Sequence, residues 1–90
     1  MKVTLTWSAS PQAVTYNVYR STVSGQQGTV IGTVAVTTYV DAAIAAGNTY
    51  YYSVTGANLA GEGPASSPQQ TVVVPNVPAA PTNLVATLGP

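Results

Sequence analysis

The chain has 90 residues with two basic and two acidic side chains, so its net charge is zero and only 4% of it is charged. This length suffices for one domain with a single core, and a 46% share of hydrophobic residues excludes the composition of a disordered chain. Cys and His are absent, which excludes disulfides, thiol nucleophiles and the usual zinc sites. The neutral balance gives no electrostatic footprint for nucleic acid or an acidic membrane. We therefore expect a non-enzymatic protein that needs no cofactor or metal.

Alternation of apolar and polar residues predicts a series of short β-strands separated by Gly, Pro and Asn turns. In chain order the predicted strands cover residues 2–8, 16–20, 29–36, 37–41, 49–57 and 71–74. Only residues 42–46 have helical propensity, and the following Gly-Asn pair ends it within about one turn. Residues 59–64 are predicted to be a glycine-rich turn. Strands of this length and spacing indicate an all-β fold, either a sandwich or a small barrel.

The C-terminal part of the chain differs from the rest. Residues 75–81 read Pro-Asn-Val-Pro-Ala-Ala-Pro, which predicts an extended, polyproline-like linker. After this linker, residues 82–88 alternate again, with Leu84 and Ala86 on one face, which predicts one more strand. The predicted division is a body over 1–74, a linker over 75–81 and a separate strand segment over 82–90.

Two segments of the body together carry a recognisable residue pattern. Leu-Thr-Trp at residues 5–7 is followed by Tyr-Asn-Val-Tyr-Arg at residues 16–20. The second segment carries, in order, Ile44, Gly47, Tyr50, Tyr52, Val54, Asn58, Ala60, Gly61, Glu62 and Gly63. This pattern resembles the fibronectin type III family. The resemblance implies a Greek-key β-sandwich of two antiparallel sheets with about seven strands.

The resemblance also implies roles for the aromatic residues. It makes Trp7 the buried core tryptophan, and it makes Tyr50 the tyrosine whose hydroxyl bonds back to nearby backbone. The inward positions of the predicted strands hold Trp7, Tyr16, Tyr39, Tyr50 and Tyr52. Tyr19 and Tyr51 remain outward, and two aromatic residues on neighbouring strands are more typical of a cross-strand pair than of a sugar-binding platform. We therefore do not expect a carbohydrate partner.

The order of the segments departs from the family. There, a Pro-rich segment of the type found at residues 78–87 opens the domain as its first strand, whereas here it comes last. The chain thus looks like a circular permutant, or a repeat whose frame is shifted out of a tandem array. Its uncharged polar surface is similar to that of spacer domains from secreted bacterial glycoside hydrolases. The residues after Met1 alternate and form no signal peptide, so we expect a recombinant piece of a larger secreted protein.

The displaced strand leads to the functional hypothesis. The linker reaches roughly 25 Å, no more than the roughly 25–35 Å height of a sandwich, so we expect the strand to leave its own body. It would complete the sheet of a neighbouring copy, either head-to-tail in a filament or reciprocally in a closed pair. The predicted donor residues are Pro81, Thr82, Asn83, Leu84, Val85, Ala86, Thr87 and Leu88, and the predicted acceptor residues are Val3, Thr4, Leu5, Thr6 and Trp7. The alternatives are a monomeric permutant whose C-terminal strand folds back onto its own body, a plain monomeric spacer whose C-terminal segment stays undocked, and a carbohydrate- or protein-binding accessory domain.

The charged residues offer no catalytic arrangement. Asp41 and Glu62 are the only carboxylate side chains, so an acid–base pair would have to consist of these two. We expect Asp41 to be a turn or cap residue and Glu62 to be a solvated charge in a turn. Lys2 and Arg20 are expected to be isolated cations.

Overall fold

A computed structural model describes residues 1–66 and 69–90 of the chain. Within these residues the regular structure consists of strands alone, which confirms the all-β prediction. The strands are β1 (Val3–Thr6), β2 (Thr15–Ser21), β3 (Thr29–Val34), β4 (Thr38–Asp41), β5 (Thr49–Asn58), β6 (Gly61–Glu62) and β7 (Gln70–Val73). No helix that could cross a membrane occurs in the described part of the chain.

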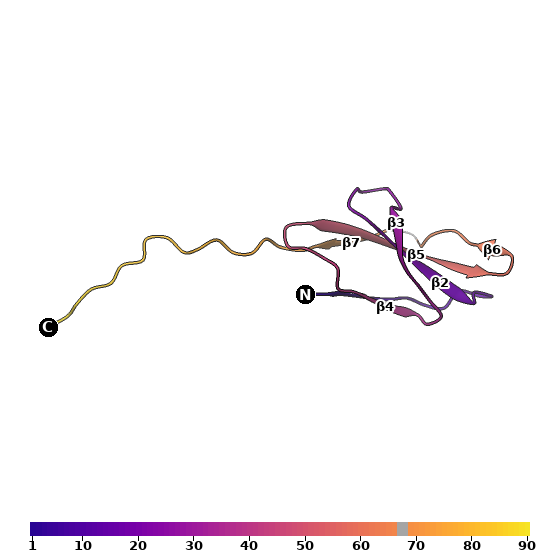
Figure 1. Cartoon of the computed structure of the whole chain (residues 1–90), viewed down its shortest axis with the longest axis horizontal. Helices are drawn as coiled ribbons and strands as arrows, with labels where there is room; N and C mark the ends of the chain where they lie inside the picture. The colour runs from indigo at the N-terminus through magenta and orange to yellow at the C-terminus, as the bar shows by residue number, and fades with distance from the viewer. Residues whose placement is uncertain (67–68) are drawn as a thin grey trace.

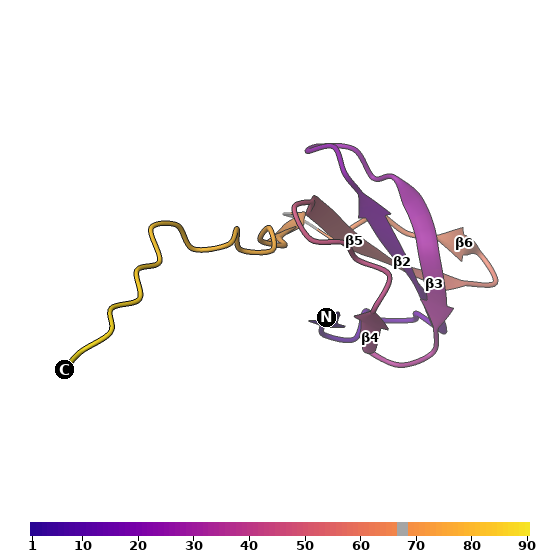
Figure 2. The same cartoon turned by 60° about the vertical axis from the view of Figure 1, so that its left-hand side comes forward.

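The strands form two antiparallel sheets that pack face to face (Figure 1, Figure 2). One sheet contains β1 and β4. In the other, β2 lies between β3 and β5, while β6 and β7 pair with opposite ends of the remaining edge of β5. The chain changes sheets after β1, after β3 and after β4, so strands distant in sequence become neighbours. This arrangement confirms the predicted Greek-key sandwich of seven strands.

The core lies between the sheets and is built mainly on the inward faces of β2 and β5. Its buried hydrophobic residues are Tyr16, Val18, Tyr50, Tyr52 and Val74. Val3 and Leu5 of β1 pack against this core but stay partly exposed. Trp7 and Tyr39 point inward as predicted but are only half-buried. The physical reason is that a sheet of two strands has no interior strand, so each of its strands is covered on one side only.

Residues 42–46 are irregular, so the helical propensity of this segment is not realised. Two backbone N–H groups of this segment donate hydrogen bonds to side chains. The Asp41 carboxylate accepts a hydrogen bond from the Ala43 N–H at 3.1 Å. The Tyr50 hydroxyl accepts one from the Ala45 N–H at 2.9 Å. Because both acceptors are fixed by the sheets, they outcompete the backbone bonds that a helical turn would form.

Residues 75–90, which we call the tail, leave the body after β7 and run away from it as an exposed segment without regular structure (Figure 1). The side chains of Leu84 and Leu88 are 92% and 98% exposed, and the molecule measures 79 × 24 × 18 Å. The predicted strand over residues 82–88 is absent from the single chain, because no strand lies beside it to bond its backbone groups. Asn83 also interrupts the extended backbone with a left-handed φ of 59°.

Candidate functional site

The backbone of β1 is bonded on one side only. β1 pairs with β4 over its whole length, and the N–H of Trp7 just beyond it donates to the C=O of Thr37 at 3.1 Å. Since bonded and non-bonded pairs alternate in an antiparallel ladder, the odd-numbered residues of β1 direct their backbone groups at β4. The N–H and C=O groups of Thr4 and Thr6 therefore point to the opposite side, where none of the described strands pairs with them.

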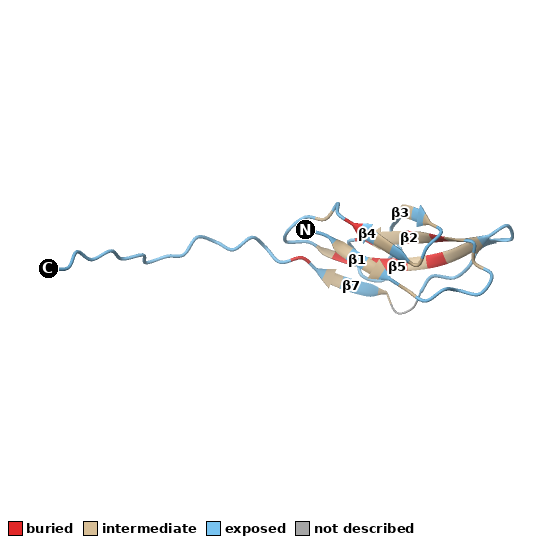
Figure 3. Cartoon of the chain, turned by 90° about the horizontal axis from the view of Figure 1, so that it is seen from below, coloured by how far each residue is buried: buried red, intermediate tan, exposed pale blue. Residues whose placement is uncertain are grey.

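A groove of about 450 Å³ runs along this open side, and we call it the β1 groove. One wall consists of residues 3–7, and the other is built from the β5–β7 side of the second sheet. The second wall contains Tyr52, Ser53, Val54, Ser66, Gln70, Thr71 and Val72. Figure 3 shows β1 and β7 near each other on the face seen from below. The groove thus exposes half-buried apolar side chains next to unpaired strand backbone, which is the surface that an added β-strand would cover.

Trp7 lies at the far end of the β1 groove, where β1 ends. Its ring packs edge-on against Tyr16, with ring centroids 5.6 Å apart and an interplanar angle of 62°. The indole Nε1 is buried and has no acceptor among the described residues. A buried donor without a partner costs about 1–3 kcal/mol. The open side of the domain therefore leaves both backbone groups and a side-chain group without partners.

The predicted donor and acceptor residues are not in contact within one chain. Residues 3–7 line the β1 groove, whereas residues 81–88 lie in the exposed C-terminal segment (Figure 3). The alternative in which the tail folds back onto its own body is not the conformation of this chain.

Three tyrosine hydroxyls bond to backbone groups, and the sequence predicted one of these bonds. Tyr50 accepts a backbone hydrogen bond from Ala45, five residues upstream, which confirms its predicted role. Tyr39 donates to the C=O of Ile31 at 2.9 Å, and the N–H of Ser10 donates to the Tyr16 hydroxyl at 3.0 Å. The bonds at Ala45 and Ser10 tie loops at the two ends of the sandwich to the core, and the Tyr39 bond joins β4 to β3.

Sequence reasoning missed a partly buried polar network between the two sheets, near the end of the sandwich where β2 and β4 end. Arg20 is not isolated: its Nη1 donates to both carboxylate oxygens of Asp41, at 2.9 and 3.1 Å. The Tyr52 hydroxyl donates to the same carboxylate at 2.7 Å, and the guanidinium lies 5.2 Å from the ring centre of Tyr50. The capping role predicted for Asp41 is confirmed by its bond from Ala43, but it is the smaller part of what this residue does.

The electrostatics of this network are set by burial and by charge pairing. Burial by itself raises the pKa of the Asp41 carboxyl, but hydrogen bonds from Tyr52 and Arg20 outweigh it and hold that pKa below its usual value. Burial and the neighbouring carboxylate raise the pKa of Tyr52 well above its usual value. A signal for this network was present in the sequence, because Arg20 is in phase with the inward residues Tyr16 and Val18. A charged residue at an inward position needs a partner.

Glu62 is exposed, but it is not simply a solvated charge, as the sequence led us to expect. It lies in β6, opposite Ala57 of β5. Its carboxylate accepts hydrogen bonds from the side chains of Asn17, Tyr19 and Thr55. The bonds from Thr55, Tyr19 and Asn17 lower the pKa of the Glu62 carboxyl. Glu62 thereby fastens the predicted turn to the outer face of the five-stranded sheet and holds the outward Tyr19 by its hydroxyl.

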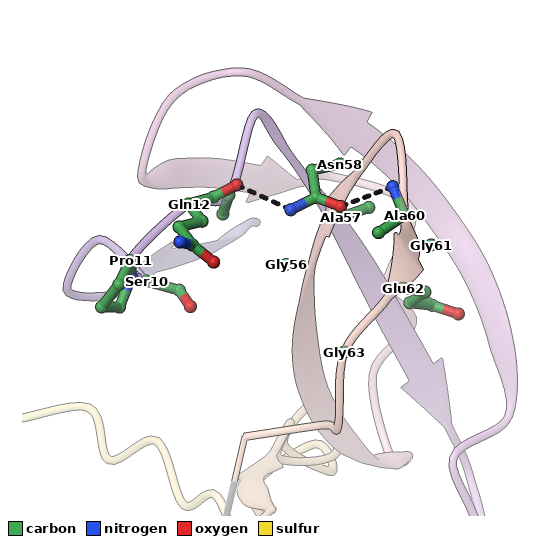
Figure 4. A pocket seen from close by; sticks show the side chains of 11 residues that line it. Ser10, Pro11, Gln12, Gly56, Ala57, Asn58, Ala60, Gly61, Glu62 and Gly63 are labelled. Atoms are coloured by element: carbon green, nitrogen blue, oxygen red, sulfur yellow. Dashed lines mark hydrogen bonds between the residues drawn. The ribbon is translucent and has the colours of Figure 1, made fainter.

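A second hollow lies between the loops at the end of the sandwich where β5 ends (Figure 4). It has a volume of about 260 Å³ and is lined by residues 10–13, 56–58 and 60–63. The Asn58 side chain donates to the C=O of Gln12 at 3.1 Å and accepts from the N–H of Ala60 at 2.8 Å. This amide therefore joins the two loops, and the lining holds no aromatic side chain on which a sugar could stack.

Neither hollow brings the two carboxylates together for catalysis. Asp41 lies in the two-stranded sheet and is held by Arg20, while Glu62 lies at the edge of the other sheet. In the part of the chain that the structure describes, no three His, Cys, Asp or Glu residues lie close enough to hold a metal ion. The β1 groove is thus the best candidate for a binding site, and its chemistry suits a β-strand.

Comparison with known proteins agrees with this fold. No family model matches the sequence. The solved structure of an Fn3-like protein from Clostridium thermocellum is similar, with a TM-score of 0.75 and 37% identity over 87% of this chain and 81% of that chain. The chain belongs to the fibronectin type III family. This fibronectin type III domain carries the fold of a non-catalytic type of module.

In sequence, 55 residues of the domain are 44% identical to part of an amylopullulanase from Thermoanaerobacter thermohydrosulfuricus. The match covers 60% of the domain and 4% of the amylopullulanase. The domain therefore corresponds to a small part of that relative.

Proposed function

We propose that this fibronectin type III domain is a non-enzymatic spacer that associates with copies of itself by donating residues 82–88 to the β1 groove of a neighbour. The observation that carries the proposal is the open side of β1, where unpaired backbone of Thr4 and Thr6 borders an apolar groove. An alternating segment of the same chain stands undocked and exposed. The β1 groove can accept an added strand, and residues 82–88 can form one when they dock there.

The spacer role is supported by the composition and by the relatives. The domain has almost no charge with which to bind nucleic acid or a charged substrate. It is similar to part of an amylopullulanase, which supports a parent protein that is an extracellular bacterial glycoside hydrolase. In such a parent the domain separates other modules, and we assign it no catalytic step.

The self-association is supported by what each partner leaves exposed. Leu84 and Leu88 are almost fully exposed in the single chain, and burying one such side chain contributes about 1.5–3 kcal/mol. Added strands also gain main-chain hydrogen bonds. The near-zero net charge removes the electrostatic repulsion that keeps many proteins apart. The displaced position of the segment, as in a permutant or a shifted repeat, explains why donor and acceptor belong to different bodies.

The test is the molar mass of the full chain, measured by size-exclusion chromatography with light scattering over a rising concentration series. We expect mass to grow with concentration above the 9.1 kDa of one chain. Leu84→Asp should abolish that growth, because it places a charge on the face that enters the groove. Val85→Asp is the matched control, since it adds the same charge on the opposite face and should retain association. A strict monomer at all concentrations would contradict the proposal and favour a plain spacer.

A further inference from the structure

The direction in which the tail leaves the body is opposite to the direction of β1. β7 runs toward the end of the sandwich at which β1 begins, and the tail continues outward from there (Figure 1, Figure 3). Val3 at the start of β1 and Val74 at the end of β7 belong to the same core cluster, so the two strand ends are close. β1 then runs away from this end toward Trp7. Whether a docked tail is parallel or antiparallel to β1 therefore depends on how the two copies are related to each other.

Three docking arrangements are possible for a tail that either continues outward from the body or turns back once. A tail that turns back at residue 75 runs along its own β1 in the same direction, which gives a parallel pair. Two copies related by a twofold axis, with straight tails exchanged, also give parallel pairs. Only a second copy in the same orientation, placed beyond the end of the tail, receives the segment antiparallel to its β1.

The antiparallel arrangement fits this molecule best. Every strand pair of the described structure is antiparallel, and parallel pairing is slightly less stable per residue. The linker between the body and the donor segment contains Pro75, Pro78 and Pro81, and such a segment is stiff and extended. A stiff linker favours a tail that continues outward over one that reverses at the body.

We propose that residues 82–88 dock antiparallel to β1 of a second copy in the same orientation, entering the groove at its Trp7 end. This inference rests on the proposed function and adds the orientation and the symmetry. Because the same step can repeat at each new copy, the assembly is open and head-to-tail. The side-chain oxygen of Thr82, which lies on the same face as Leu84, then arrives near the indole N–H of Trp7, for which the described residues of the single chain supply no acceptor.

The test uses chemical cross-linking between two versions of the full chain, which has no natural cysteine. The acceptor version carries Leu84→Asp, so that it cannot donate, together with either Thr4→Cys or Ser8→Cys. The donor version carries Asn83→Cys or Thr87→Cys. All four cysteines lie on the outward face of their strand. A short bismaleimide then joins only residues that lie beside each other.

The four combinations separate the two orientations. Antiparallel docking joins Ser8→Cys to Asn83→Cys and Thr4→Cys to Thr87→Cys, and the other two combinations should give several-fold lower yields. Parallel docking gives the reverse pattern and would overturn the inference. If mixed chains associate but no combination cross-links, the tail docks elsewhere and the inference is again wrong, while self-association stands.

Failure of the proposed self-association gives a different result from failure of the antiparallel docking. If the unmodified chain stays a strict monomer, self-association itself is wrong, whatever the cross-links show. If association of the unmodified chain stops at two copies, with the parallel pattern, a closed exchanged pair replaces the open assembly. Continued growth in mass with concentration, together with the antiparallel pattern, supports the inference.

Discussion

The two sheets of this domain differ in whether they contain strands that are bonded on both sides. In the five-stranded sheet, β2 is bonded on both sides, and β6 is fastened by three side-chain bonds to Glu62. In the two-stranded sheet, among the residues that the structure describes, β1 is bonded on one side only, and the buried N–H of Trp7 has no acceptor. The comparison teaches that a sheet with interior strands can face a smaller sheet whose β1 is incomplete along its open side. The incomplete side is where we locate the function.

Removing the ion pair that joins the two sheets should give the largest effect. Asp41→Ala leaves Arg20 and the Tyr52 hydroxyl without their partner in a buried site. We expect a loss near the lower end of about 3–5 kcal/mol, because Arg20 is partly exposed. Urea unfolding measures it.

Glu62→Ala is the matched control, because Glu62 is the other hydrogen-bonded carboxylate but lies exposed at the sheet edge. It should shift the urea midpoint far less. Equal shifts for the two variants would mean that the Arg20–Asp41 pair does not hold the sheets together.

Acid should weaken the contact between the two sheets through the same carboxylate. The pKa of Asp41 is lowered in the folded state. In acid the unfolded chain therefore binds more protons than the folded chain, and the free energy of unfolding decreases as the pH falls. The stabilisation is fully present above the ordinary carboxyl pKa of about 4 and is lost as pH falls through the lower folded value. Because His is absent, we expect little change between pH 5 and 8. Urea midpoints from pH 8 to pH 2 test this, and Asp41→Asn should flatten the acid limb.

Removing the tail tests whether the open side gains stability from a neighbour. The full chain should show a melting temperature that rises with protein concentration, since association stabilises the folded state by mass action. A chain that ends after Val74 should melt at a concentration-independent temperature. The single Trp gives a second readout, because the Trp7 indole N–H signal in an NMR spectrum should move with concentration only in the full chain. A concentration-dependent melting temperature in the shortened chain would place the association surface elsewhere.

A small gain should follow from straightening the donor segment. Asn83 has a left-handed backbone, which a β-branched residue adopts poorly. Asn83→Val should favour the extended conformation and tighten association by about 0.5 kcal/mol, roughly twofold in Kd. Sedimentation equilibrium can resolve this difference. Asn83→Gly is the comparison, since it keeps access to the left-handed region and should not tighten association.

The inward positions of Tyr16, Tyr50 and Tyr52 could be predicted because side chains alternate along a strand, which is a local property of the backbone. The bond from Ala45 to the Tyr50 hydroxyl could be predicted from a short family pattern. The partners of Arg20 could not, because Asp41 is 21 residues away and reaches it only through the packing of two sheets. The donors to Glu62 come from two other strands and were missed for the same reason.

The sequence by itself determined six of the seven strands, the faces of most core residues and the presence of an extra alternating segment after a proline-rich linker. These follow from local periodicity and from backbone restrictions at Pro and Gly. Only the tertiary structure decided that β1 keeps an open side, that a groove lies beside it and that the tail leaves in the opposite direction. Edges, grooves and directions depend on which distant strands become neighbours, and that is set by the packing of the whole chain.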